Sequence, residues 1–599
     1  MDQVAKLLGR RPDVTFKRLG NNAKALTKFV YVTEVLPNIT EYMVTDKADG
    51  ERAFLIADEN SSVYFTATEQ QELKSTMDFV GVFDCELIDD VLYIFDVLEW
   101  NGQSLVDEPF RERHKFLLQI KPNKNVSAKT YKPLNISTYQ MNIAAKYNER
   151  KPYQIDGLIF TSLNDSYLRT ENFKWKPPNQ LTIDFLYASS ILWVGMNRRL
   201  WKRLGFPLPP NYRELLKPHI NVDKFMRGDT ITSEYFPVPF ETSMQIHIDM
   251  PDFGKDLAYE GKIIELSVER DAKTKKYKWL FHHIRVDRTK ELNNNYFGND
   301  YRIAELTLQS ALNPLTMNDL IASYTTITKG FYFRKQDDTY TAIRKFNNYV
   351  KKILIQRHAT QNVVDLASGK GQDIMKYIYN KVSILNLVEI DDNAIEELIM
   401  RKYTMAEQIH VPDINSPINI RAGKPYGVIL KVWSLDLNRP WKENAMHMKS
   451  VVGSKNIFCN FALHYMMWDL KHIENICAFV DHFLEKGCEF IFTAFDGVKV
   501  KQFIKKPWET EKYMVAASSK PNAIRVRLPC SDEPYDEPII DLAILDRVFK
   551  KHKIMRTEHA SFNLFLQDFR HHKPQFSRML DSSDLKFIDL YAYTVYKKN

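Results

Sequence analysis

Lys47 is the residue whose neighbours most clearly suggest covalent chemistry. It stands in the run Thr-Asp-Lys-Ala-Asp-Gly-Glu-Arg, so Asp49, Gly50 and Arg52 follow it closely. A lysine amine can attack a phosphorus atom when it is neutral, and a nearby cation such as Arg52 favours that form. The run predicts a lysine that becomes covalently joined to a nucleotide. Asp-Gly is also the commonest surface β-turn pair, so this run alone is weak.

An ordered series of residues downstream supports this interpretation. Glu86 ends a predicted strand and suits a ribose contact, and Phe95 in the next strand suits stacking on a base. Asp156 offers a carboxylate for a divalent metal, Mg²⁺ or Mn²⁺. Lys174 and Lys176 are two residues apart in a strand, so both point to one face and suit phosphates. Each charge alone is more often a solvated surface group, but their order makes coincidence improbable.

A second chemistry is indicated by Gly369 and Gly371, which follow the predicted strand Asn-Val-Val-Asp-Leu and open a helix. Glycine lets the backbone approach a ligand closely. Asp391, at the end of the next strand, is placed to accept the hydroxyls of a ribose. The G-x-G-x-x-G pattern of dinucleotide-binding turns is absent, so S-adenosylmethionine is favoured over a dinucleotide.

The elements that must hold these residues differ between the two halves of the chain. Short apolar strands separated by turn residues run from about residue 41 to 186, and a Pro-rich stretch then precedes further strands. Beyond residue 324, strand, helix and strand alternate, which predicts a largely parallel sheet. We therefore expect domains at residues 1–190, 191–300 and 325–599, with a linker at 301–324.

Composition sets the class of protein. The chain has 599 residues, which predicts two to four domains, and its 83 Lys and Arg against 75 Asp and Glu give a net charge of +8. This charge is compatible with a polyanionic partner but is not diagnostic. Five scattered cysteines argue against disulfides or structural zinc. Without a secretory signal or a long apolar run, we expect a cytoplasmic protein with no membrane contact.

The residues around Lys47 resemble the collinear motifs of covalent nucleotidyltransferases, the superfamily of mRNA guanylyltransferases and ATP-dependent ligases. The resemblance implies a ligase-type, ATP-grasp-like domain, followed by an OB-fold lid that carries the run Arg-Val-Asp-Arg and closes over the triphosphate. Arg288 stands where lysine is commoner in the family. It implies these nucleotide contacts, with GTP as the substrate: Arg52, Glu86, Phe95, Lys174, Lys176, Arg285, Asp287 and Arg288.

Two runs in the C-terminal half resemble mRNA cap guanine-N7 methyltransferases. Residues 344–355 are similar to the F-N-N-W-x-K helix of that family, and residues 460–465 to its Q-F-x-x-H-Y run, with Tyr349 for tryptophan and Asn460 for glutamine. The resemblance implies a Rossmann-like domain in which orientation and electrostatics, not a general base, promote attack by guanine N7. It implies donor contacts at Lys351, Asp365, Gly369, Asp391, Asp436 and Asn460, and cap contacts at Asn348, His464, Tyr465 and Glu537.

Across its length the chain resembles the fused guanylyltransferase–methyltransferase part of poxvirus, asfarvirus and yeast linear-plasmid capping enzymes. The run Tyr-Phe-Gly-Asn-Asp-Tyr at residues 296–301 is particularly similar. This α/β multidomain family transfers GMP from GTP through a lysyl-GMP intermediate to diphosphate-ended RNA, and then methylates N7 of the cap. The implied partners are the 5′ end of nascent mRNA, a viral-type RNA polymerase and a methyltransferase-stimulating subunit. No paired Glu-x-Glu strands of the viral triphosphatase are visible.

Two other interpretations remain. An ATP-dependent nucleic-acid ligase with an accessory methyltransferase-like fold would share the lysine chemistry, but it leaves the runs at 346–355 and 461–465 unexplained. A noncatalytic RNA-binding scaffold is disfavoured, because the nucleophile and the phosphate-facing cations are all present. Labelling of the protein by GTP or by ATP would separate the first two.

Overall fold

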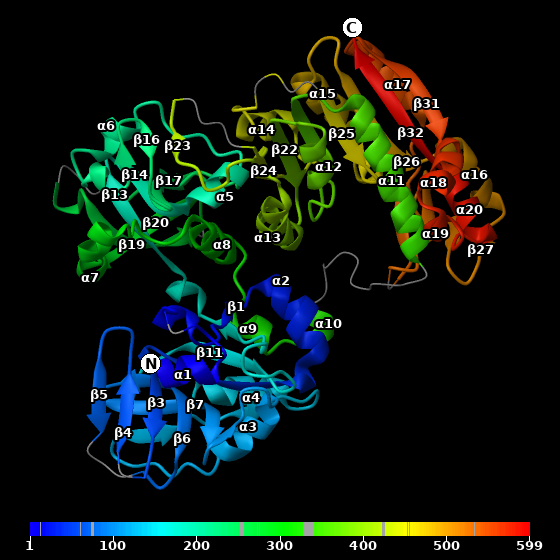
Figure 1. The fold of residues 1–599 in the computed structure, drawn as a ribbon. Coiled ribbons are helices and arrows are strands. Elements are labelled where there is room, and N and C mark those ends of the chain that lie inside the picture. The colour runs from blue at the N-terminus through cyan, green and yellow to red at the C-terminus, as the bar shows by residue number, and fades with distance from the viewer. Residues whose placement is uncertain are drawn as a thin grey trace. The chain divides into compact units, whose positions relative to one another are not determined.

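The computed structural model describes residues 1–599 except 12, 60, 74–76, 252–256, 272, 275, 328–339, 422–425, 452, 454–455 and 532. It divides into two compact units: Met1–Leu181 with Ser310–Gly330, and Thr182–Gln309 with Phe331–Asn599. Figure 1 labels the elements of both. No helix in the described part of the chain is long and apolar enough to cross a membrane.

The first unit is built on two β-sheets. Its strands are β1 (Lys24–Ala25), β2 (Tyr42–Ala48), β3 (Glu51–Ala57), β4 (Ser62–Phe65), β5 (Gln70–Leu73), β6 (Gly81–Ile88), β7 (Val91–Trp100), β8 (Gln103–Ser104), β9 (Val126–Ala128), β10 (Lys132–Pro133), β11 (Ile155–Ser162) and β12 (Phe173–Trp175), and its main helices are α1 (Asp2–Leu7), α2 (Lys28–Val30), α3 (Phe110–Leu117) and α4 (Tyr139–Tyr147). One sheet has the order β1-β12-β11-β2-β10, and the other β5-β4-β3-β6-β7-β8 with β9 on β7. In β7, Leu92 and Ile94 are fully buried, whereas Tyr93 and Phe95 are only partly buried. Successive side chains of a strand point to opposite faces, so β7 has one face in the core and one open face.

The segment Ser310–Gly330 packs within the first unit. Trp175 Nε1 donates to the Leu315 carbonyl (2.7 Å), and the Tyr31 hydroxyl donates to the Leu320 carbonyl (2.8 Å). The stretch predicted as a linker, 301–324, is instead ordered by α8 (Tyr301–Leu312), α9 (Met317–Leu320) and the start of α10 (Tyr324–Ile327). Buried Ala304 and Leu308, spaced for one helix face, explain α8.

Residues Thr182–Gln309, here called the middle domain, form a β-rich part of the second unit. The elements are β13 (Thr182–Ala188), β14 (Ile191–Asn197), α5 (Arg198–Arg203), α6 (Tyr212–Leu216), β15 (Met226–Arg227), β16 (Thr230–Ile231), β17 (Tyr235–Pro239), β18 (Ile248–Asp249), β19 (Lys262–Arg270), β20 (Tyr277–Ile284), α7 (Val286–Lys290) and most of α8. The sheet order is β17-β14-β13-β19-β20-β18. The boundary predicted at 190–191 falls inside the β13–β14 hairpin, so the structure divides the chain earlier, at 181–182.

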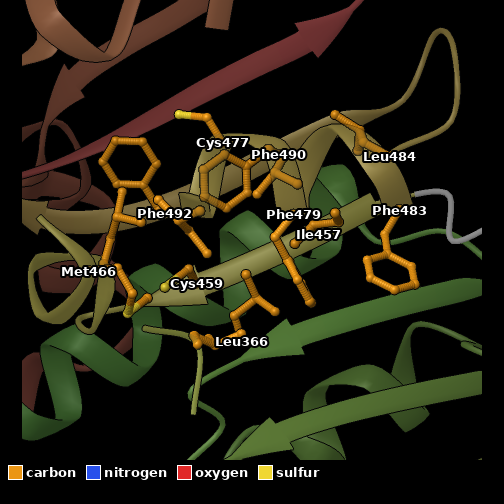
Figure 2. Packing of buried hydrophobic residues seen from close by; sticks show 14 of the residues in the cluster. Leu366, Ile457, Cys459, Met466, Cys477, Phe479, Phe483, Leu484, Phe490 and Phe492 are labelled. Atoms are coloured by element: carbon orange, nitrogen blue, oxygen red, sulfur yellow. The ribbon is translucent and has the colours of Figure 1, made fainter. Parts of the chain in front are cut away.

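The rest of the second unit is an α/β domain. Its elements are α11 (Thr341–His358), β21 (Asn362–Leu366), α12 (Ile374–Tyr379), β22 (Ile384–Glu389), α13 (Asp392–Gln408), β23 (Ile418–Asn419), β24 (Ile429–Ser434), α14 (Trp441–His447), β25 (Asn456–Asn460), α15 (Leu470–Phe483), β26 (Glu489–Phe495), α16 (Gly497–Lys505), β27 (Trp508–Glu509), β28 (Met514–Ala517), β29 (Ala523–Arg527), β30 (Tyr535–Pro538), α17 (Leu542–Lys551), β31 (Ile554–Ser561), α18 (Leu566–His572), α19 (Pro574–Ser577), α20 (Ser582–Asp589) and β32 (Tyr591–Lys598). Strands β24, β22, β21, β25 and β26 are parallel, as predicted, and β32 and β31 complete the sheet. Figure 2 shows Phe479 of α15 among Ile457, Cys459 and Phe490 in the core beneath it.

The middle domain is joined to this α/β domain at the edge of its sheet. Gln245 N donates to the Val432 carbonyl (2.8 Å), and Val432 N donates to the Ser243 carbonyl (2.7 Å), so the middle domain adds a short parallel segment to edge strand β24. Strand β16 also pairs with β23. An unpaired sheet edge invites aggregation, so these contacts both cover the edge and fix the two domains to each other.

Candidate active sites

Strand pairing brings Lys47 beside Asp156. Strands β2 and β11 run antiparallel with Gly157 opposite Lys47, and the Lys47 ammonium forms an ion pair with the Asp156 carboxylate. Lys176 Nζ lies 2.9 Å from the same carboxylate oxygen. Three residues predicted from the sequence therefore share one small cluster of charge.

Lys174 completes this cluster from strand β12, where its register partner on β11 is Ile159. Although its side chain is exposed, partial burial of the amine and the positive charges of Lys47 and Lys176 lower its pKa. Three ammonium groups around one carboxylate form a site that attracts a polyanion.

Arg52 and Glu86 lie on neighbouring strands but hold different partners. Arg52 Nε donates to buried Asp84 (3.0 Å), and its guanidinium also donates to the Tyr167 hydroxyl (3.0 Å). Glu86 lies 2.5 Å from Lys129 Nζ and accepts a hydrogen bond from Gly50 N (3.4 Å). Glu86 is thus tied to the turn that follows Lys47, whereas Arg52 is already compensated by a carboxylate.

Phe95 lies half-buried on β7, at an irregularity where the register with β6 shifts. Tyr93 is the register partner of Glu86 across the β6–β7 pair, so Glu86 and the Tyr93 ring share the open face of the sheet, with Phe95 two residues further along β7. This arrangement would suit a base and its ribose.

Buried Asp46, next to Lys47, holds residues that sequence reasoning missed. It is fully buried and lies 3.3 Å from Lys146, 3.7 Å from Lys151 and 3.9 Å from Lys129, and it accepts a hydrogen bond from Tyr153 (2.8 Å). Burial raises the pKa of Asp46, but the charge of Lys129, the hydrogen bond from Tyr153 and the other two lysines lower it overall. These four residues follow Asp46 by 83 to 107 positions, so no local spacing in the sequence reveals them.

The predicted triphosphate motif gathers in the second unit, at the start of α7. Arg285 pairs with Asp287 (2.9 Å) and with Asp184 (3.2 Å), and Arg288 pairs with Glu291 (2.9 Å). The hydrogen bond from Arg285 lowers the pKa of Asp287 to about 2. The three predicted residues therefore form one ion-pair network.

The predicted donor residues meet at the carboxyl ends of β21 and β22. Lys351 of α11 lies 2.8 Å from Asp373, which also pairs with Lys376 at 2.5 Å. Burial, and then the charge of Asp373, raise the pKa of Asp365 to about 8. Gly369 and Gly371 have φ of 54° and 67°, a conformation that glycine adopts without strain.

Asp391 caps helix α13, and its Oδ1 accepts from Asn393 N (2.9 Å). Glu389, which the sequence interpretation passed over, accepts from Gly369 N (2.7 Å), Ile390 N (2.8 Å) and Asp391 N (3.0 Å). It joins the glycine turn to the end of β22, so it holds both halves of the predicted ribose site. Asp436 follows β24 and accepts from Asn438 N (2.9 Å).

Three of the four predicted cap residues, His464, Tyr465 and Glu537, also come together. His464 Nδ1 lies 3.7 Å from Glu537 Oε2, and the rings of His464 and Tyr465 are 4.1 Å apart. Burial lowers the pKa of His464 to about 3 and raises that of Glu537 to about 8, so burial disfavours the charged form of both. Asn348 has a different partner: its Oδ1 accepts a hydrogen bond from Lys376 Nζ (3.4 Å).

Two features mark this end of the sheet as a place for a ligand. Asn460 Nδ2 and His464 Nε2 are buried and have no hydrogen-bond partner among the described residues, although most buried polar atoms are paired. Ala367 and Phe461, directly after β21 and β25, have left-handed φ of 51° and 58°. Such strain in non-glycine residues concentrates at functional sites.

Comparisons with known proteins match both halves of the chain. Residues 22–176 match the family model of the ATP dependent DNA ligase domain, and residues 316–516 that of the mRNA (guanine-N(7))-methyltransferase domain. The chain is 26% identical to the mRNA-capping enzyme of African swine fever virus (strain Badajoz 1971 Vero-adapted), over 97% of this chain and 71% of that protein. These matches place the chain in the family of bifunctional mRNA-capping enzymes of the asfarvirus type.

More distant relatives agree with this placement. The chain is 23% identical to the probable mRNA-capping enzyme of Acanthamoeba polyphaga mimivirus, over 78% of this chain and 49% of that protein. It is 27% identical to the mRNA cap guanine-N(7) methyltransferase 1 of rice, over 26% of this chain and 39% of that protein. The predicted fold class, a ligase-type nucleotidyltransferase domain followed by an S-adenosylmethionine-dependent methyltransferase domain, is confirmed.

Proposed function

We propose that Lys47 attacks the α-phosphate of GTP, releases pyrophosphate, and then passes GMP to the 5′ end of a diphosphate-ended RNA. The observation that carries this proposal is the convergence of Lys47, Lys174 and Lys176 on Asp156 within the ligase-type domain. Lys47 needs a free lone pair to attack, so its ammonium must lose a proton and separate from Asp156 before the N–P bond forms and the bond to pyrophosphate breaks. Lys174 and Lys176 would then hold the α-phosphate and stabilise its developing charge.

Asp156 is the carboxylate that would hold Mg²⁺ or Mn²⁺ in this site. The described residues contain no group of three or more His, Cys, Asp or Glu side chains fit to hold a metal ion. One carboxylate is nevertheless sufficient, because Mg²⁺ in nucleotide sites takes most of its ligands from phosphates and water. The cation would neutralise phosphate charge, while Glu86 and the open face of β7 would hold the ribose and base.

In the second step, the α/β domain would methylate N7 of the cap guanine with S-adenosylmethionine. Gly369, Asp391 and Lys351 would position the donor, and His464, Tyr465 and Glu537 would frame the guanine. None of these residues needs to remove a proton, because the N7 lone pair attacks the methyl group directly. The buried atoms Asn460 Nδ2 and His464 Nε2 support ligand binding here, since binding would give each a partner.

The middle domain would act as the OB-fold lid of the nucleotidyltransferase, with Arg285, Asp287 and Arg288 serving the triphosphate. Its run Arg-Val-Asp-Arg resembles the family motif, and the ion pairs that gather these residues at the start of α7 support this role. The partners would be the 5′ end of nascent mRNA, a viral-type RNA polymerase and a stimulating subunit for the methyltransferase.

Labelling with α-³²P-GTP or α-³²P-ATP in the presence of Mg²⁺ tests the first half-reaction. Covalent labelling by GTP, followed by transfer to diphosphate-ended RNA, is expected. Labelling by ATP in preference to GTP would instead assign ligase chemistry. This alternative is tested because residues 22–176 match the ATP dependent DNA ligase domain.

A further inference from the structure

Five exposed cations stand on or directly after three helices of the methyltransferase domain that pack together, and we call them the basic face. They are Lys345 and Lys352 on α11, Arg570 and Lys573 at the end of α18, and Arg578 after α19. Within the described residues, none of the five has a carboxylate at ion-pairing distance. Their charges are therefore available to an external anion.

Packing of α18 and α19 along α11 holds these cations together. Lys345 Nζ lies 5.3 Å from the ring centre of Phe576 on α19. Tyr349 of α11 packs against Phe569 of α18, with ring centres 5.4 Å apart, and against His572, at 6.1 Å. In Figure 1, α11, drawn in green, lies beside the orange-red helices α18 and α19. The basic face is thus a built feature of three packed helices.

Helix geometry connects the basic face to the proposed cap site. With 3.6 residues per turn, Lys345 and Lys352 project between the side of α11 that carries Asn348 and the side that carries Tyr349. Asn348 contacts Lys376 near the donor residues, whereas Tyr349 faces α18. The cations of α11 therefore lie between a residue assigned to the cap and the cations of α18 and α19.

Asp568 of α18 is a carboxylate beside this face, and it is already engaged. It accepts a hydrogen bond from the Tyr349 hydroxyl and lies 3.1 Å from His572 Nδ1. Asp568 therefore does not neutralise the five cations on α11, at the end of α18 and after α19, and the basic face keeps a net positive charge.

We propose that the basic face binds the phosphodiester backbone of the transcript directly behind the cap while the guanine occupies the methyltransferase site. This inference rests on the proposed methyltransferase function and on the sequence-based assignment of Asn348 to the cap. Unpaired surface cations suit a phosphate backbone, because binding releases condensed counterions and breaks no existing ion pair. A single-stranded RNA end needs no base-specific contact to follow such a surface.

Methylation kinetics of the full chain on two substrates test the proposal. The substrates are the dinucleotide GpppA and a GpppA-capped RNA of about 20 nucleotides. The variant Lys345→Gln/Lys573→Gln/Arg578→Gln should raise KM for capped RNA by about tenfold and leave KM for the dinucleotide unchanged. The slope of log affinity against log salt should become shallower by about 2, because each of the three lost contacts to single-stranded RNA contributes about 0.7 to that slope.

The matched control is Lys471→Gln/Lys486→Gln/Lys550→Gln, which removes the same charge from exposed lysines elsewhere on this domain. Equal effects of both variants on capped RNA would overturn the proposal in favour of general charge. An equal rise in KM for the dinucleotide would also overturn it, because the residues would then act in the cap or donor site. A normal KM for RNA together with lost binding of an acidic protein would assign the face to protein partners.

Failure of the proposed methyltransferase activity would be distinguishable. If the wild-type chain methylates neither substrate, anisotropy of labelled RNA still compares the two variants directly. Weaker binding by the basic-face variant alone would support the RNA surface, and equal binding would reject it.

Discussion

Glu305 of the middle domain and Lys402 of the methyltransferase domain form a 2.8 Å ion pair in which only 1% and 7% of the side chains are exposed. Glu305 also accepts from Ser243 N (2.6 Å) and from the Tyr403 hydroxyl (2.5 Å). Burial raises the pKa of Glu305, but Lys402 and these hydrogen bonds lower it overall, so the carboxylate is held ionised. The two domains are therefore coupled by a satisfied buried charge.

Glu305→Ala should destabilise the second unit by about 3–5 kcal/mol, because it leaves Lys402 buried without its partner. Urea unfolding of the full chain, followed by tryptophan fluorescence, measures this. Arg302→Ala, which breaks an exposed pair with Glu407 at the same interface, should cost less than about 1 kcal/mol. A fragment of residues 325–599 should also have a lower free energy of unfolding than a fragment of residues 182–599. Equal losses of stability in Glu305→Ala and Arg302→Ala would count against coupling through the buried pair.

Lys47→Ala should abolish covalent labelling by GTP while leaving methylation of preformed GpppRNA largely intact. The amine is the only group proposed to bond to phosphorus, and it lies outside the unit that holds the methyltransferase domain. Gel autoradiography and a methyl-transfer assay on the same preparation provide the two readouts. Lys24→Ala, which removes an exposed lysine of the same unit, is the control. Persistent labelling of Lys47→Ala would show that the nucleophile lies elsewhere.

Arg285→Ala should impair formation of enzyme–GMP at least tenfold more than transfer of GMP to RNA. Only the first half-reaction involves the β- and γ-phosphates and the departing pyrophosphate, whose charge a guanidinium stabilises. Single-turnover kinetics of each half-reaction, starting from isolated enzyme–GMP for the second, give the comparison. Equal losses in both steps would point to a folding defect in the ion-pair network around Asp184 and Asp287.

Asp391→Ala should weaken S-adenosylmethionine binding by about 2–4 kcal/mol, because two ribose hydroxyls would lose a charged acceptor. Tyr465→Ala should instead raise the KM for cap with little effect on the donor. Calorimetric titration with the donor and methylation kinetics with GpppA separate the two effects. Loss of donor binding in Tyr465→Ala of the same size would contradict the separation of the two subsites.

Cap binding should depend on pH through Glu537. Its pKa of about 8 keeps the carboxyl protonated at neutral pH, whereas accepting hydrogen bonds from guanine N1–H and the 2-amino group requires the ionised form. Binding then releases one proton below pH 8, so cap affinity should rise about tenfold per unit between pH 6 and 8 and level off above. Glu537→Gln should remove this dependence in a fluorescence titration with GpppA; a pH-independent wild type would contradict the assignment.

Sequence reasoning located the nucleotidyltransferase residues better than their partners. Lys47 and Asp156 are 109 positions apart, and only their order along the chain, matched to a family, suggested that they meet. The pairing of β2 with β11 brings them together. Arg52 was expected to face the nucleotide, but its contacts with Asp84 and Tyr167 depend on tertiary packing that no local spacing records.

The domain limits were harder to predict for a physical reason. Strands β13 and β14, on the two sides of residue 190, are both mostly apolar and buried, so nothing local marks the change of sheet before β13. In the methyltransferase domain the parallel sheet was predicted because strand and helix periods alternate clearly. Glu389 was missed because its role depends on three backbone amides, which have no signature in the sequence.

The buried pair of Glu305 and Lys402 has a consequence for synthesis on the ribosome. Glu305 emerges 97 residues before Lys402, and the strand that receives Ser243 and Gln245 emerges later still. Until then the middle domain holds an unpaired carboxylate and an unoccupied backbone edge. Because unsatisfied charge and open edges oppose folding, the middle domain should reach its final state only after translation has passed β24.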